Sequence, residues 1–203
     1  MDDDCRPPPF PGLSPDGAEV SQEIRSWQER GLSLGTDRYR RYLALFGSTT
    51  SSCVGQAVCD YGCGPFGGVL SVLRDVGVAF PVDILAEEYN LWGYSAFPIH
   101  TIDAEGRADV PSASCDVAFC LQCLDHTAEP SVIVADLFRI LKPGGVLRLF
   151  VHLRERTKGH YPLTVSQTLR LLAPWEVCSV DTGRDIPNNE PELEAVWVTV
   201  LRP

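Results

Sequence analysis

Five short apolar runs alternate with stretches of helical spacing, and this alternation limits the folds open to the chain more than any other feature. The runs are Ala57–Tyr61, Ala79–Ile84, Ile99–Asp103, Asp116–Leu121 and Val146–His152. Most are apolar on both sides, as is typical of strands that are covered on both faces. Helical spacing recurs between them, in Gly68–Val76, Glu87–Tyr94 and Ser131–Leu141. The pattern predicts a mostly parallel sheet with helices on both faces.

The C-terminal part follows a different pattern. Thr164–Leu172 has helical spacing, and two further strand-like runs follow at Trp175–Val180 and Ala195–Leu201. No helix separates these two runs, so they should pair antiparallel as a hairpin. The complete expectation is an α/β, doubly wound fold with a mostly parallel seven-stranded sheet and an antiparallel C-terminal hairpin.

The N-terminal part divides at about residue 18. Residues 1–17 hold five prolines and few apolar residues, which predicts a disordered leader. Residues 18–203 then form a single domain. Within residues 18–50, the apolar positions of Val20–Trp27 and Asp37–Phe46 predict two helices. These helices either pack on the core or form a lid over a pocket, and in the second case Tyr39 contacts the substrate.

The composition favours a cytoplasmic protein. There are 17 basic and 27 acidic residues, and this net charge of -10 argues against a nucleic-acid partner. No apolar window is long enough for a membrane helix, and the first residues lack the pattern of a signal peptide. The eight cysteines are expected to be reduced. Cys120 and Cys123 form a CxxC without a second pair, so no metal site is expected.

A glycine-rich segment, Gly62–Gly67, lies directly after the first predicted strand. It reads GCGPFG, a GxGxxG at a strand-to-helix turn, and Asp83 follows 21 residues after Gly62. Glycines let the backbone approach a nucleotide, and a carboxylate at the next strand end can accept hydrogen bonds from ribose hydroxyls. A packing turn or a dinucleotide site would also use such glycines. Asp60, however, is a poor neighbour for a pyrophosphate and suits a cationic ligand.

Several segments resemble the class I S-adenosylmethionine-dependent methyltransferases, over roughly residues 37–203. They are VCDYGCGPFGG, PVDILAEEY, HTIDAEG, CDVAFCLQCLDHTAEP and FRILKPGGVLRLF. The resemblance implies S-adenosylmethionine as cofactor, S-adenosylhomocysteine as product and a methyltransferase activity. The residues expected to hold the cofactor are Asp60, Gly62, Cys63, Gly64, Asp83, Ile84, Asp103, Ala104 and Gln122.

Methyl transfer is an in-line displacement that depends mainly on proximity, with a general base for some acceptors. His126 and His152 follow predicted strands at the edge where ligands of open α/β sheets bind, so they are the catalytic candidates. His160 and Tyr161 are candidates for substrate contact. The acceptor and the methylated atom, oxygen, nitrogen or carbon, stay open, as does a homodimer. The alternatives are an NAD-type oxidoreductase and a non-catalytic member of the same fold that binds the cofactor or a partner.

Overall fold

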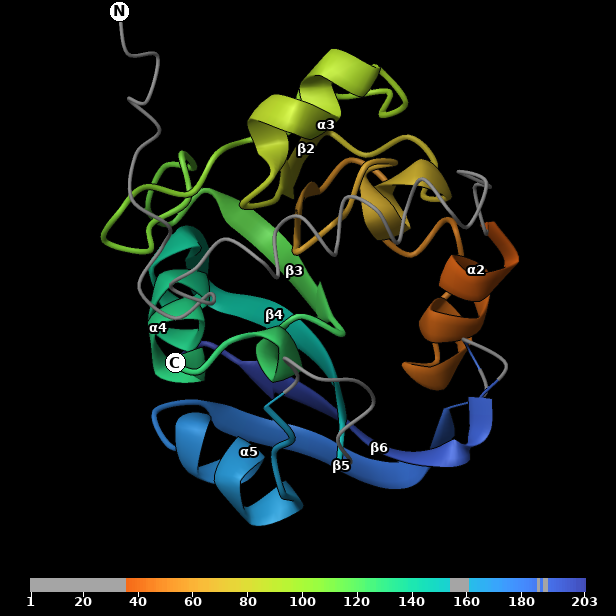
Figure 1. The fold of residues 1–203 in the computed structure, drawn as a ribbon, viewed down its shortest axis with the longest axis vertical. Helices are drawn as coiled ribbons and strands as arrows, with labels where there is room; N and C mark the ends of the chain where they lie inside the picture. Colours follow the sequence, from red (N-terminus) through yellow and green to blue (C-terminus); the bar gives the residue numbers. More distant parts are fainter. Residues whose placement is uncertain (1–35, 154–160, 186, 188–189) are drawn as a thin grey trace, which may run out of the picture.

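The computed structural model describes residues 36–153, 161–185, 187 and 190–203, and within these it forms one six-stranded sheet with helices on both sides (Figure 1). The strands are β1 (Ala57–Tyr61), β2 (Val78–Val82), β3 (Cys115–Leu121), β4 (Leu141–His152), β5 (Glu176–Asp185) and β6 (Glu190–Leu201). The α-helices are α2 (Thr36–Leu45), α3 (Ala86–Trp92), α4 (Pro130–Ile140) and α5 (Val165–Leu171). Two short 3₁₀ turns are η1 (Gly68–Ser71) and η2 (Leu124–His126).

The sheet has the order β2-β1-β3-β4-β6-β5. The first four of these strands are parallel, and β6 pairs antiparallel with both β4 and β5. The predicted C-terminal hairpin is therefore confirmed. All the parallel strands end at the same edge of the sheet, which gathers residues distant in sequence at one place.

The expected seventh strand, Ile99–Asp103, is wrong for the described residues. This segment makes only two isolated bridges, from His100 to Val82 and from Ile102 to Ala108. After the His100 bridge its hydrogen bonds go to the loop that follows: the Asp103 amide donates to the Arg107 carbonyl, and the Thr101 carbonyl accepts from the Asp109 amide, both at 2.9 Å. The segment turns back on itself as a hairpin instead of extending along β2.

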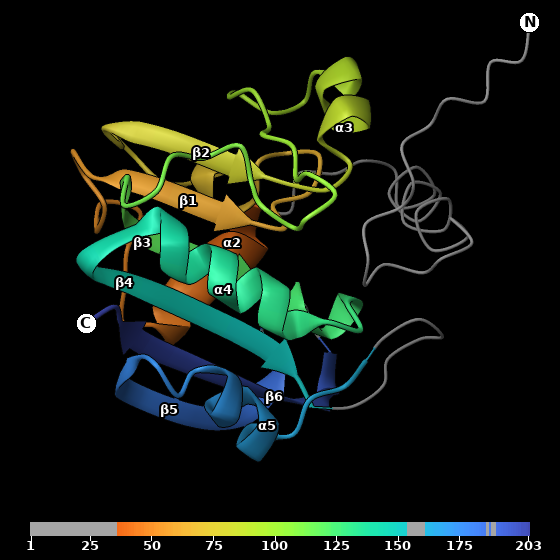
Figure 2. The ribbon, with the colours of Figure 1, turned by 90° about the vertical axis from the view of Figure 1, so that its left-hand side faces the viewer.

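Two apolar cores lie on opposite faces of the sheet. Figure 2 shows α4 on one side of the strands and α2 on the other. Strand residues alternate between them: Cys120 faces the core under α4 and α5, and Phe119 faces the core under α2 and η1. Burial on both faces explains why the parallel strands read as continuous apolar runs.

The predicted helix Gly68–Val76 is also wrong, since only the four-residue turn η1 forms there. Gly67 and Gly68 have positive φ angles of 74° and 56°, which an α-helix does not allow. Beyond η1, Arg74 donates its amide to the Thr50 carbonyl, and Gly55 donates to the Asp75 carbonyl. The backbone hydrogen bonds that a helix would use are thus made with the loop before β1.

The remaining predicted helices and strands match observed elements within a few residues. The main difference is in β4, which begins at Leu141 and not at the predicted start, Val146. The leader 1–17, the helix Val20–Trp27 and His160 lie outside the described residues. Among the described residues, none of the helices has the length and apolarity to span a bilayer.

Candidate functional site

The glycine loop after β1 is held tightly against the end of β2. Gly62 and Cys63 both donate their amides to the Val82 carbonyl, at 2.8 and 3.1 Å. A Cβ added to Gly62 would lie 2.8 Å from the Cys123 side chain, which comes from the segment after β3. Only glycine therefore allows the ends of β1, β2 and β3 to approach one another here.

Asp83 bridges the glycine loop and the start of α3. Its Oδ2 accepts from the Gly64 amide at 2.9 Å, and its Oδ1 accepts from the Leu85 amide at 3.0 Å. Ile84 lies next to it in the turn before α3 and is partly buried. The predicted pairing of the glycine loop with a carboxylate at the end of the second strand is thus present in the geometry.

Asp60, the penultimate residue of β1, lies beneath the same loop. Its side chain is almost completely buried, and Oδ2 accepts from the Val69 amide at 2.5 Å. Burial raises the pKa of Asp60 to about 7, and the nearby Asp83 carboxylate adds to the shift. A cation placed near this loop would stabilise the ionised form of Asp60.

Two side chains of α2 approach the loop from the other face. Arg38 donates from Nη2 to the Tyr39 hydroxyl at 2.8 Å, and its charge acts on both Asp60 and Asp185. Tyr39 is buried, and burial raises its pKa. The position of α2 agrees with both alternatives for this helix, because it packs on the core and also borders the loop. Cys63 is a buried thiol whose pKa burial raises well above its usual range.

Asp103 and Ala104 lie on an exposed turn of the hairpin that follows the His100 bridge. Asp103 Oδ1 accepts from the amides of Glu105 and Arg107, at 3.0 and 2.8 Å. The carboxylate thereby closes its own turn with one oxygen.

A buried charged cluster joins the ends of β3, β4 and β5. His152, the last residue of β4, has Nδ1 3.0 Å from Asp125 Oδ2 and Nε2 2.7 Å from Asp185 Oδ2. All three side chains are at most 1% exposed. Gln122 has a positive φ of 56°, and its side-chain Nε2 lies 2.9 Å from His152 Nε2. We call these four residues the His152 cluster.

The cluster changes what His152 can do. Burial alone disfavours the imidazolium, but the hydrogen bonds to Asp125 and Asp185 raise the pKa of His152 to about 9. An imidazolium bonded on both nitrogens has no lone pair that could accept a proton. In this arrangement His152 binds two carboxylates together, and the geometry does not support its expected role as a general base.

The other acceptor-side candidates lie beside the cluster. His126 ends η2 and is partly buried. Tyr161 donates its amide to the Asp125 carbonyl at 2.7 Å and borders an open pocket of about 570 Å³ between residues 127–130 and α5. The cofactor-side and acceptor-side candidates therefore share the carboxyl edge of the sheet.

Sequence reasoning missed three residues of this site. Asp185 lies between the two predicted strands of the C-terminal hairpin, Asp125 precedes the candidate His126, and Arg38 is one of several basic residues on a short amphipathic helix. The segment between those two predicted strands holds two aspartates, Asp181 and Asp185, and nothing in the pattern placed either against His152.

Comparison with protein families agrees with this architecture. Residues 59–149 match a family model described as "Methyltransferase domain". Among curated relatives, a ubiquinone biosynthesis O-methyltransferase of Pseudomonas putida is 34% identical over 125 residues, which is 57% of this chain and 51% of the relative. The corresponding protein of Methylococcus capsulatus is 31% identical over 105 residues, 48% of this chain and 44% of the relative. The chain thus spans about half the length of these relatives.

Solved structures share the fold over most of the chain. A Burkholderia thailandensis 1,6-didemethyltoxoflavin-N1-methyltransferase, with substrate and S-adenosylhomocysteine bound, has a TM-score of 0.60 at 18% identity and covers 100% of this chain and 93% of its own. The [4+2]-cyclase SpnF has a TM-score of 0.64 at 17% identity, with coverage of 96% and 98%. The cyclase demonstrates that this fold alone does not determine the reaction.

Proposed function

We propose that this chain, which carries a methyltransferase domain of the class I fold, transfers a methyl group from S-adenosylmethionine to a small-molecule acceptor. The cofactor would lie across the carboxyl ends of β1, β2 and β3. The acceptor would approach from the ends of β3, β4 and β5, beside α2 and the pocket next to Tyr161.

One observation favours S-adenosylmethionine over a dinucleotide. The amides of Gly62, Cys63 and Gly64 all donate to protein oxygens, and two carboxylates, Asp60 and Asp83, flank the loop. A pyrophosphate needs free amides at the start of a helix, and repels carboxylates. A ligand with a sulfonium and an ammonium group would instead be stabilised by them.

The proposed roles follow from position. Gly62 and Gly64 allow close approach of the methionine part, and Asp60 supplies negative charge near it. When the cofactor binds, Asp83 would accept hydrogen bonds from the ribose hydroxyls in place of those from the backbone amides. Other residues proposed to border the cofactor are Cys63, Ile84, Asp103, Ala104 and Gln122. Proximity supplies most of the rate.

His126 is the proposed base or orienting group for the acceptor, since it is partly buried and follows β3 at the carboxyl edge. Tyr39, Tyr161 and His160 are the proposed acceptor contacts. Hydroxyl acceptors are the first class to test, because the matching relatives are named O-methyltransferases, and amines are the second, because a structural neighbour is named an N-methyltransferase.

Calorimetric titration of the protein with S-adenosylhomocysteine, beside NAD, tests the cofactor. We expect binding of the first and none of the second. Asp83→Ala should abolish binding, whereas Asp181→Asn, on the exposed face of β5, should leave it intact. Binding of NAD alone, or of neither ligand, would contradict the proposal.

Turnover is tested separately with methyl-labelled S-adenosylmethionine and a panel of hydroxyl and amine acceptors. Label in a product supports methyl transfer, and His126→Ala then tests the base. Cofactor binding without labelled product across the panel would favour the non-catalytic alternative.

A further inference from the structure

An ion pair on α4 holds the hairpin that carries Asp103. The hairpin, residues 101–110, is closed by the Ile102–Ala108 bridge and by the Asp103 amide, which donates to the Arg107 carbonyl at 2.9 Å. Its turn is exposed, whereas Gly106, Ala108 and Val110 are buried. His100, directly before the hairpin, is hydrogen-bonded to the end of β2, and the hairpin beyond it is held by further contacts.

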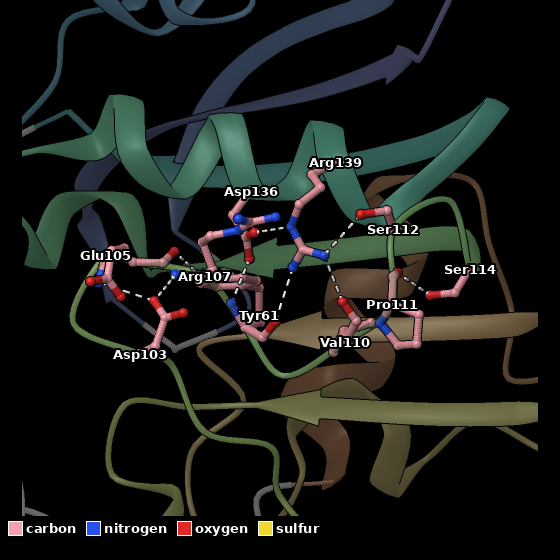
Figure 3. A network of polar contacts seen from close by, with 12 residues as sticks. Tyr61, Asp103, Glu105, Arg107, Val110, Pro111, Ser112, Ser114, Asp136 and Arg139 are labelled. Carbon is pink, nitrogen blue, oxygen red and sulfur yellow. Dashed lines mark hydrogen bonds and ion pairs between the residues drawn. The ribbon is translucent and has the colours of Figure 1, made fainter.

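Asp136 and Arg139 supply these contacts from one helical turn of α4. Arg139 Nε lies 2.6 Å from Asp136 Oδ1, and the Asp136 side chain is 2% exposed. Figure 3 shows both side chains pointing from the helix to the hairpin. A surface ion pair of this spacing stabilises little, but here Asp136 is buried, Arg139 is only 19% exposed, and both side chains make further hydrogen bonds to the hairpin.

The pair binds both polar groups of one hairpin peptide position. Asp136 Oδ2 accepts from the Ala108 amide at 2.9 Å, and Arg139 Nη2 donates to the Ala108 carbonyl at 2.9 Å. Arg139 Nη1 also donates to the Val110 carbonyl at 2.7 Å. The planar, five-donor guanidinium satisfies two carbonyls and a carboxylate at once, which a lysine cannot do.

A second contact comes from β1. The Tyr61 hydroxyl, buried at the end of that strand, lies 3.4 Å from the Gly106 carbonyl at the hairpin turn. Tyr61 is also the residue directly before the glycine loop. The hairpin is therefore tied on one side to α4 and on the other to the strand that leads into the cofactor site.

We propose that Asp136 and Arg139 are positioning residues that fix the place of the Asp103 turn, which the resemblance to the methyltransferases implies would bind the adenine amino group. Neither residue contacts the cofactor. This inference rests on the proposed function for the identity of the ligand, but the anchoring itself concerns only the protein. If the pair is broken, the hairpin loses its fixed place relative to Gly62 and Asp83, and its own hydrogen bonds open more often.

Adenine selectivity is the readout that a merely structural role would not change. Titrations should compare S-adenosylhomocysteine with S-inosylhomocysteine, which lacks the amino group, in Arg139→Met and Asp136→Asn. We expect the wild type to prefer the adenine compound and the variants to bind it about ten-fold more weakly, the effect of one lost hydrogen bond, with the inosine compound changed less than about two-fold. Arg139→Lys should restore part of the preference.

Lys142→Met is the matched control. Lys142 lies just after the C-terminal end of α4 and forms an ion pair with Asp116 at 2.7 Å. This ion pair contacts β3 and not the hairpin. We expect its ligand selectivity to equal that of the wild type. An equal loss of affinity for both ligands in Arg139→Met, or an unchanged preference, would overturn the proposal.

Amide hydrogen exchange separates this proposal from the proposed function. In Arg139→Met and Asp136→Asn without ligand, the amides of Asp103, Gly106 and Asp109 should exchange at least about ten-fold faster, with β3 and β4 unchanged. Unchanged exchange would overturn the anchoring even if the ligand binds. A wild type that binds no S-adenosylhomocysteine would contradict the proposed function, and the exchange rates would still decide the anchoring.

Discussion

The ionisation of Asp60 should be linked to ligand binding at the glycine loop. With the pKa of Asp60 raised to about 7 by burial, the free protein holds this carboxyl partly protonated near neutral pH. A cationic ligand favours the ionised form, so its binding should release a proton.

We predict that affinity for S-adenosylhomocysteine rises from about pH 6 to about pH 8, because ionised Asp60 is the form that attracts the ligand ammonium. Calorimetry at neutral pH in two buffers of different ionisation enthalpy measures the released proton. Asp60→Asn should bind more weakly and lose the pH dependence. An Asp60→Asn profile that matches the wild type would assign the titration to another group.

The raised pKa of His152 predicts that the free energy of unfolding falls as the pH rises. Its folded pKa, about 9, lies above the unfolded value near 6.5, so the folded state binds the proton more tightly. This contribution is complete below about pH 6.5 and is lost as the pH rises through about 9. Urea unfolding across that window should show a falling free energy of unfolding.

His152→Gln tests the assignment. Removing the imidazolium leaves Asp125 and Asp185 close together in a buried site, which should cost roughly 3–5 kcal/mol at neutral pH. The variant should also lose the decline between pH 6.5 and 9. A decline as steep as in the wild type would mean that the cluster does not control it.

At the scale of the elements, η1 is shaped by the approach of the glycine loop to β1. A Cβ on Gly68 would lie 2.0 Å from Asp60 Oδ2, at a residue whose φ is +56°. The turn η1 therefore forms around the Asp60 carboxylate. This turn stands in place of the helix that was expected there.

Gly68→Ala should accordingly abolish binding of S-adenosylhomocysteine and destabilise the protein by several kcal/mol, about the effect of a clash plus a strained φ. The control is Gly144→Ala, because Gly144 has a φ of +76° but no atom within 4 Å of an added Cβ. It should cost only about 1 kcal/mol of backbone strain and leave binding intact. Equal effects in both variants, by thermal unfolding and calorimetry, would contradict the steric explanation.

The elements that could be predicted from sequence are those decided by local pattern. Apolar runs identified β1, β3 and the C-terminal hairpin, and helical spacing with a following Pro-Gly-Gly identified α4. Ile99–Asp103 failed because it folds back on its own loop at Ala108, and Gly68–Val76 failed because its backbone bonds to a distant loop at Thr50. Such long-range hydrogen bonds leave no periodic signal.

The same distinction holds for the site. Gly62, Gly64 and Asp83 come together as their spacing predicted, since a strand–turn–helix pattern determines where they lie. The match of residues 59–149 to a methyltransferase-domain model agrees with the resemblance over that part of the chain. The His152 cluster could not be foreseen, because it brings Gln122, Asp125 and Asp185 together across three strands. The roles of the candidate residues stay predictions.

At the scale of the whole molecule, the sheet has two halves that meet between β3 and β4. The strands β2, β1 and β3 lead into the glycine loop, Asp83 and Gln122, which are proposed to hold the cofactor, whereas β4 and β5 carry His152 and Asp185. Among the described residues, the His152 cluster links the two halves at the carboxyl edge.

We predict that S-adenosylhomocysteine at 100 times its Kd stabilises the protein by about 2.7 kcal/mol, while added protection from hydrogen exchange is confined to the glycine loop, the Asp103 hairpin and the end of β3. The β5–β6 hairpin should change little, because it does not line the cofactor site. Protection spread evenly over all six strands would argue against two separable halves.

The order of the strands also has a consequence for synthesis on the ribosome. β5 joins the sheet only through β6, yet β5 precedes β6 in the chain and carries Asp185. A nascent chain can therefore assemble the glycine loop, β3 and β4 while His152 still has one of its two carboxylates. The second arrives only after residues 190–201 have been translated and have paired with β4, so the His152 cluster is completed last.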